Sequence, residues 1–174
     1  MDRGELSGRH FTDAAQLVVR HIAERAMDRG MLAGELTEAT AGMLAVLSVL
    51  RWERKVALAA LERLGTDLDR LARDLDDAID AERRSSRRPG ALQLEVLPTG
   101  QRGIVVDADA PRRPLLGQAE HEALGMGNDW VGTEHLLLAA VRFACLRFRV
   151  VLDRHAISYD QVKEAVREVL RGGQ

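Results

Sequence analysis

The sequence contains a single cysteine, Cys145, among its 174 residues. One thiol cannot form a disulfide within the chain, and a scarcity of cysteine is typical of proteins in the reducing cytosol. We therefore predict a cytoplasmic protein. Because Cys145 lies in an apolar stretch, we also expect its thiol to be buried in the core.

Aromatic residues are also scarce, at 3% of the chain, although apolar residues overall make up 46%. A core with so few rings must be built from leucine, valine, alanine and isoleucine, which favours helices over a β-sandwich. No apolar run reaches the ~20 residues of a membrane span, and residues 1–5 lack the apolar segment of a signal peptide. The net charge of −2 gives no basic field for nucleic acid. We expect neither a membrane nor a nucleic-acid partner.

The signatures of enzymes and metal sites are missing as well. Neither lysine of the chain, Lys55 or Lys163, follows a glycine, so a Walker A phosphate loop is excluded. No nucleophile elbow of the form Gly-x-Ser-x-Gly occurs. Glu134 and His135 are adjacent, and neighbours on a helix point about 100° apart, so we expect no dyad. The histidines lack metal-ligand spacing; they are His10, His21, His121, His135 and His155. We predict a non-enzyme without a cofactor or metal.

Helical patterns fill most of the chain after a polar segment, residues 1–10, which we expect to form a flexible arm. Apolar residues at helical spacing predict four helices within residues 11–82. Thr12 is placed to cap the first of them, with Asp13 in its first turn. Thr37 or Thr40 is placed to cap the second, which is almost continuously apolar and therefore central.

The pattern changes within residues 83–111. An arginine- and serine-rich stretch there is typical of a linker, and apolar residues then alternate over about 92–97, before a β-branched segment at 103–107. This alternation predicts a β-hairpin inserted between two helical halves. Two interpretations of the hairpin stay open: it packs on its own domain, or it offers a strand edge to a partner. The linker is likewise either a solvated connector or a basic docking patch. The candidate partner surface comprises Arg83, Arg84, Arg87, Arg88, Pro98, Thr99, Gly100 and Gln101.

Four more helices are predicted within residues 112–174. Pro114 suits the first turn of the fifth helix. Gly132 allows a tight approach at the entry of the sixth, and Thr133 is placed to cap this apolar helix, with Glu134 in its first turn. We expect the seventh over residues 143–152, with Leu146 and Val150 on its apolar side, toward the core. Ser158 and Gln161 have the spacing of a capping box at the start of the eighth.

The segment Val-Gly-Thr-Glu-His-Leu-Leu-Leu-Ala, residues 131–139, resembles the signature of the Clp N-terminal domain, the substrate- and adaptor-docking module of Clp-type AAA+ unfoldases. Phe-Thr-Asp-Ala-Ala, residues 11–15, resembles the opening of a repeat of that family. Further matching positions are Ala60-Leu61, Leu64-Gly65, Glu122-Ala123, Gly127, Val151-Leu152 and Ser158. The resemblance implies an all-α fold, a pseudo-twofold tandem of two four-helix Clp repeats, here with the hairpin between them.

In some Clp N-terminal domains each repeat has a pocket for a phosphorylated arginine, lined by a threonine of the opening helix and the glutamate of Gly-Thr-Glu-His. Thr133 and Glu134 match that set in the second half, and Thr12 matches it in the first. The opening threonine of the second half is replaced near Asp109, and Gly-Thr-Glu-His is replaced in the first half near residues 41–44. Each pocket is thus expected to keep half its set. The alternative is that Thr133 and Glu134 only form the start of a helix.

The resemblance implies a protein–protein interaction module, an adaptor or regulator that contacts a Clp unfoldase, the protease core, an adaptor or a client. Two alternatives stay open. In the first, the chain is the detached N-terminal substrate-recognition domain of a longer Clp ATPase. In the second, it is a diverged module that binds a small molecule or peptide and is unlinked to Clp.

Overall fold

The computed structural model describes residues 10–31, 36–52, 56–85, 93–96, 102–105 and 114–172. For 93–96, 102–105 and Pro114 it describes the backbone alone. The predicted flexible arm, the hairpin tip and most of the linker lie outside these ranges. Helices dominate the described residues: α1 (Asp13–Asp28), α2 (Glu38–Trp52), α3 (Val56–Arg63), α4 (Leu68–Ser85), α5 (Pro114–Gly125), α6 (Thr133–Arg142), α7 (Leu146–Arg154) and α8 (Tyr159–Gly172). The predicted all-α class is confirmed at this level.

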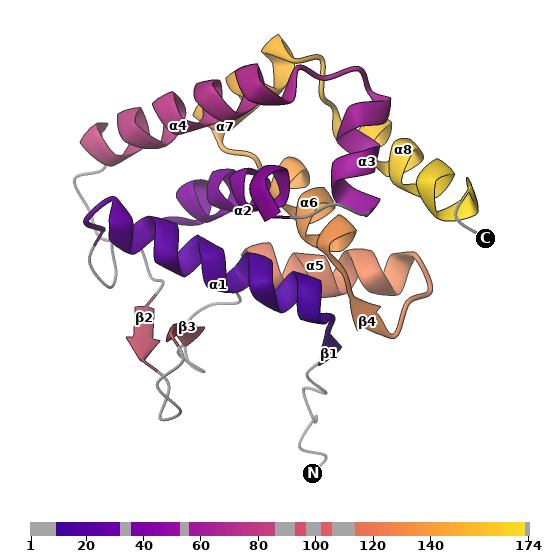
Figure 1. Ribbon diagram of the computed structural model, residues 1–174, viewed down its shortest axis with the longest axis horizontal. Helices are drawn as coiled ribbons and strands as arrows, with labels where there is room; N and C mark the ends of the chain where they lie inside the picture. The colour runs from indigo at the N-terminus through magenta and orange to yellow at the C-terminus, as the bar shows by residue number, and fades with distance from the viewer. Residues whose placement is uncertain are drawn as a thin grey trace.

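Helices α2 and α6 form the centre of the molecule (Figure 1). Every residue of α6 from Thr133 to Val141 is buried, as is every residue of α2 from Thr40 to Val49. Helix α1 covers α2 on one side, α4 covers it on the other, and α5 packs along α6. Both central helices are enclosed by their neighbours. Their largely apolar side chains are therefore buried on every side of the helix, not on one face alone.

Most helix entries form as the sequence predicts. The Thr12 hydroxyl accepts the Ala15 backbone N–H at 3.2 Å, which caps α1. Thr37 caps α2 by accepting the Thr40 N–H, also at 3.2 Å. Ser158 and Gln161 form the predicted capping box of α8: the Gln161 N–H donates to the Ser158 hydroxyl, and the Ser158 N–H donates to the Gln161 side-chain oxygen.

The seventh helix differs from its prediction. It begins at Leu146, three residues later than expected, because α6 ends at Arg142 and Phe143 forms its C-cap. Cys145 is the N-cap of α7, where its sulfur accepts the Phe148 N–H, so the thiol is half-buried at a helix start instead of deep in the core. The side chain of Leu146, expected in the core, is 83% exposed, because Phe148, Val151 and Leu152 take the buried face of the helix.

Two short sheets complete the fold. Strands β1 (His10–Phe11) and β4 (Trp130–Val131) pair in parallel, with His10 opposite Trp130 and Phe11 opposite Val131. Strands β2 (Gln93–Val96) and β3 (Arg102–Val105) pair antiparallel, within the region where the sequence predicts a hairpin. The predicted linker begins too early, since α4 runs on through Arg83 and Arg84 to Ser85.

The same order of features recurs in the two halves. A left-handed residue follows the first and the third helix of each half: Gly30 and Gly65 in the first, Gly127 and Ala156 in the second. A central buried helix, α2 or α6, comes second in each half. Among the described helices, none is long and apolar enough to cross a membrane.

Candidate functional site

Strands β1 and β4 bring the starts of α1 and α6 together, although these helices belong to different halves of the chain (Figure 1). The Thr12 backbone N–H donates to the Val131 carbonyl at 3.0 Å. Thr12 is the N-cap of α1, and Val131 lies directly before Gly132, the N-cap of α6. The two expected half-pockets therefore do not stand apart: Thr12 lies beside the entry that carries Thr133 and Glu134.

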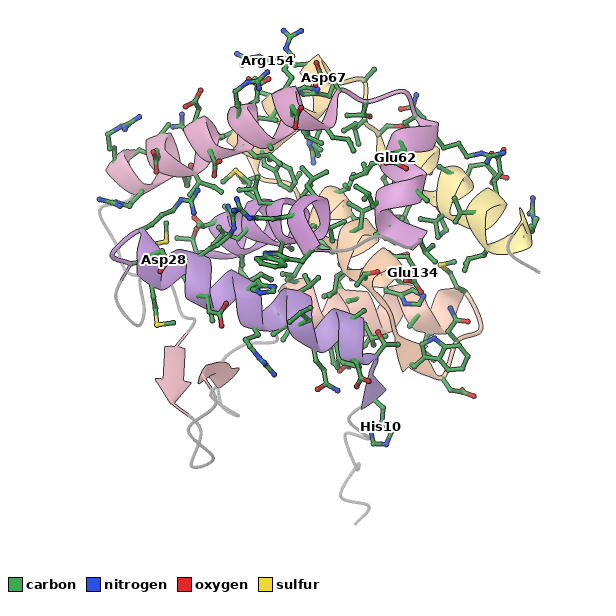
Figure 2. All side chains as sticks on the ribbon, viewed as in Figure 1. His10, Asp28, Glu62, Asp67, Glu134 and Arg154 are labelled. Carbon is green, nitrogen blue, oxygen red and sulfur yellow. The ribbon has the colours of Figure 1, made fainter. Side chains whose placement is uncertain are left out.

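The Glu134 side chain folds back over Gly132. A methyl group built at the Gly132 α-carbon would collide with both carboxylate oxygens of Glu134, so a glycine is needed for this close approach. The residue Glu134 is 7% exposed, and Figure 2 shows it at the start of α6. A carboxylate at this point also faces the positive end of the α6 dipole. The predicted tight approach at Gly132 is confirmed.

His135 holds this entry in place. Its Nδ1 accepts the Gly132 N–H at 2.8 Å, and its Nε2 is hydrogen-bonded to the Asn128 side-chain amide at 3.0 Å. Burial lowers the pKa of His135 to about 4, against a smaller opposing effect of Glu122, so the ring is neutral at pH 7. The ring thus closes the loop between α5 and α6.

The structure corrects one sequence-based expectation about this entry and the reasoning behind another. Thr133 does not cap α6: it is the first helical residue, 3% exposed, and the N-cap is Gly132, which has no side chain. Glu134 and His135 do meet, with Oε1 3.4 Å from Nδ1, because the glutamate side chain turns back along the helix. Since Nδ1 already accepts the Gly132 N–H, it carries no proton to share with the carboxylate, and the contact is no catalytic dyad.

A second pair of helix starts lies at α2 and α5. The Glu38 carboxylate, in the first turn of α2, accepts the Leu115 N–H at 3.4 Å in the first turn of α5. Burial raises the pKa of Glu38, and the Leu115 hydrogen bond opposes that shift. Thr37 thus holds at the start of α2 the N-cap position that Gly132 holds at α6, and residues 41–44, near which the sequence analysis places the replaced motif, lie inside α2.

A buried carboxylate that sequence reasoning assigned no role lies behind the entry. Glu122 of α5 is 2% exposed and accepts hydrogen bonds from Tyr159 at 2.7 Å, Arg142 at 2.8 Å and Gln118 at 3.0 Å. Burial acts to raise the pKa of Glu122, but these three donors together leave it below its usual value. The network joins α5, α6 and α8, so it sets the position of α6 from behind.

Exposed side chains surround the paired helix starts. Trp130 is 51% exposed and Leu124, near the end of α5, is 55% exposed. His10, opposite Trp130 in the parallel pair, is also exposed, and Figure 2 shows it at the start of β1. Trp130 precedes Glu134 by four residues. A carboxylate and an exposed indole on one helix entry suit a peptide segment with a cationic group, because the carboxylate accepts N–H donors and the indole offers apolar area.

The described part of the other predicted surface lies away from this site. Arg83 and Arg84 lie at the far end of α4, away from β4 and the start of α6 (Figure 1). The Arg83 guanidinium donates to the Arg29 carbonyl at the end of α1. Arg87, Arg88, Pro98, Thr99, Gly100 and Gln101 lie outside the described residues. Among the described residues, no group of three or more His, Cys, Asp or Glu side chains is arranged to hold a metal.

One of the comparisons with known proteins bears on the fold. No family model matches the sequence, and no curated protein matches it. Among solved structures, the chain is similar to the crystal structure of the Hsp104 N-terminal domain from Candida albicans, with a TM-score of 0.59 and 17% identity. That match covers 95% of this chain and 93% of the other. The protein therefore has a fold similar to that of the Hsp104 N-terminal domain.

Proposed function

We propose that this chain is a non-catalytic module that binds other proteins, built as two copies of one four-helix unit. Within the Clp system it acts as an adaptor or regulator of an unfoldase or protease. Its similarity in fold to an Hsp104 N-terminal domain supports the general role. The specific role in the Clp system rests on one observation: the starts of α1 and α6 are paired, and the Glu134 carboxylate folds over Gly132.

Thr12, Thr133 and Glu134 are the proposed pocket. The Thr12 oxygen accepts the Ala15 N–H, so its hydroxyl hydrogen can donate to an anionic group. The Glu134 carboxylate can accept guanidinium N–H groups. Phosphoarginine, the ligand that the family resemblance implies, carries both kinds of group. Trp130 would contact the rest of the bound segment.

A co-precipitation from a lysate of the native organism tests the proposal. Tagged wild-type protein is compared with Glu134→Ala and, as a matched control, with Asp153→Ala, an exposed acidic residue of α7 outside the pocket. We expect wild type and Asp153→Ala to recover Clp unfoldase or protease subunits, and Glu134→Ala to lose them. A fourth variant, with residues 98–101 replaced by Asn-Gly, tests the predicted hairpin surface.

The outcomes separate the alternatives. Recovery of no Clp component by folded wild-type protein would remove the adaptor role and favour the diverged peptide- or small-molecule-binding module. Recovery of unfolded clients without unfoldase would instead favour the detached substrate-recognition domain. Titration calorimetry with free phosphoarginine, beside arginine plus inorganic phosphate, then identifies the ligand: binding of phosphoarginine alone, lost in Glu134→Ala, is expected.

A further inference from the structure

A groove runs between α4 and α7, on a part of the surface that the proposed function does not use. Its volume is about 640 Å³. Helix α4 contributes one wall and α7 the other, and Ala78 and Val151, both buried, form its floor. The full lining comprises Asp74, Asp77, Ala78, Glu82, Cys145, Leu146, Arg147, Val150, Val151 and Arg154.

A side-chain contact joins the two walls at each end of the groove. His155 Nε2 is hydrogen-bonded to the Asp74 carboxylate at 2.9 Å at one end, and Arg147 Nε forms an ion pair with the Glu82 carboxylate at 3.0 Å at the other. These contacts fix the spacing of α4 and α7, which run antiparallel. They also engage two of the three carboxylates on the α4 wall, so the groove is braced independently of any ligand.

The α7 lip of the groove is apolar and open. Leu146 is 83% exposed and Val150 is 44% exposed, and their spacing of four residues places them on one face of the helix. Leu146 has the highest exposed fraction among the large hydrophobic side chains that the structure describes. The side chain was expected in the core, and no sequence pattern explains its position in water. An apolar pair at this spacing matches the way grooves receive an amphipathic helix.

Two charged side chains of the lining lie outside the contacts at the ends of the groove. Across the part of the chain that the structure describes, neither Asp77 on α4 nor Arg154 on α7 takes part in an ion pair. Because α4 and α7 are antiparallel, the groove presents Arg154, then Asp77, then the apolar lip. A complementary segment needs an acidic residue, then a basic residue, then an apolar pair.

We propose that the groove between α4 and α7 docks an amphipathic helix of a partner protein. The helix carries two apolar residues four positions apart, a lysine or arginine one turn away from them, and an acidic residue a further turn along. The apolar pair packs between Leu146, Val150 and the floor. The basic residue pairs with Asp77 and the acidic residue with Arg154.

The test is a selection from a phage-displayed library of helical peptides of about 16 residues, roughly four turns, randomised on one face. Wild-type protein is the target, with counter-selection on Leu146→Asp. Because Leu146 is exposed, this substitution leaves the fold intact. We expect enriched peptides to show the order acidic, basic, apolar pair. Their affinity should fall more than about tenfold in Leu146→Asp and be unchanged in Leu170→Asp, an exposed leucine on α8 that belongs to neither site.

Charge reversal sharpens the result. For the best peptide, Asp77→Lys should weaken binding about two- to fivefold, as expected for an exposed ion pair, and changing the basic residue of the peptide to glutamate should restore it. Asp69→Lys, on α4 outside the groove, is the control. Enrichment of no peptide, or of peptides that bind Leu146→Asp equally well, would overturn the proposal. A wild-type dimer that Leu146→Asp dissociates in sedimentation would also overturn it, since a second copy would then be the occupant.

Discussion

The starts of the two central helices, α2 and α6, are built in opposite ways. At α2 the N-cap residue itself supplies the capping side chain. The Thr37 hydroxyl accepts the Thr40 N–H, and the hydroxyl oxygens of these two threonines lie 3.0 Å apart. At α6 the N-cap is a glycine, and the third helical residue, His135, reaches back to the Gly132 N–H. Both starts are stable, but only the second leaves room for a carboxylate above the cap.

The carboxylates of the two helix starts lie in different directions. Glu38 in α2 reaches outward and accepts the Leu115 N–H at the start of α5. Glu134 in α6 turns back over its own cap, Gly132.

Replacing the third residue of each central helix, His135 in α6 and Thr40 in α2, should give the largest difference in stability between the two helix starts. We expect His135→Ala to lower the free energy of unfolding by about 3–5 kcal/mol, because it opens a buried cavity and leaves the Gly132 N–H without its acceptor. Thr40→Ala should cost only about 1 kcal/mol, since the Thr37 cap remains. Urea denaturation of both variants measures the difference, and equal losses would contradict it.

Acid should weaken the α6 entry. The pKa of His135 is about 4 in the folded protein against 6.5 for a free histidine. The unfolded chain therefore binds the proton first, so the contribution of the neutral ring is complete above pH 6.5 and is lost as the pH falls toward 4. We expect a loss of about 2 kcal/mol by about pH 5. His135→Gln should flatten that part of the stability profile; an unchanged slope would contradict the assignment.

Exchanging the caps tests the role of Gly132. Gly132→Ala places a methyl group against the Glu134 carboxylate and should cost about 1–3 kcal/mol. Glu134→Ala removes the obstacle, so the double variant should cost less than the two single losses added together. Thr37→Gly, which gives α2 the same cap residue, should cost only a few tenths of a kcal/mol. Strict additivity at the α6 entry would show that the carboxylate does not lie over Gly132.

The smallest effect concerns Glu38. Because burial raises its pKa, the folded state binds the proton more readily, and wild type gains stability relative to Glu38→Gln as the pH falls. At pH 7 the two proteins should differ by less than about 0.5 kcal/mol, close to the value of one carboxylate at a helix start. Thermal denaturation at pH 7 and at pH 4 measures this, and a variant that gains stability in acid would contradict it.

The helix caps with side-chain oxygens could be predicted from sequence because the interaction is local: Thr12, Thr37 and Ser158 each bond within three residues. The start of α7 could not be predicted, since cysteine is an unusual N-cap and the apolar run continues across the turn. The entry of α6 was anticipated as a tight approach, but the cap was assigned to Thr133.

The assembly of the candidate site was beyond sequence reasoning for a different reason. Thr12 and Val131 are distant in the chain, and each belongs to a separate half, so no periodicity links them. Counting residues within one half gave two incomplete pockets. The parallel pairing of β1 with β4 gathers the contributions of both halves at one place. The groove at Leu146 escaped prediction because the buried face of a short helix depends on what packs against it.

The bond between Thr12 and Val131 also bears on synthesis of the chain by the ribosome. Helix α1 emerges first, but the strand that anchors its N-terminus is made only after most of the chain. At roughly 5–20 residues per second, α1 waits on the order of ten seconds for β4. Force measurements with a translational arrest sequence should therefore record no pulling from this contact until residue 131 has left the exit tunnel. Helix α1 is thus translated long before the contact that fixes its start can form.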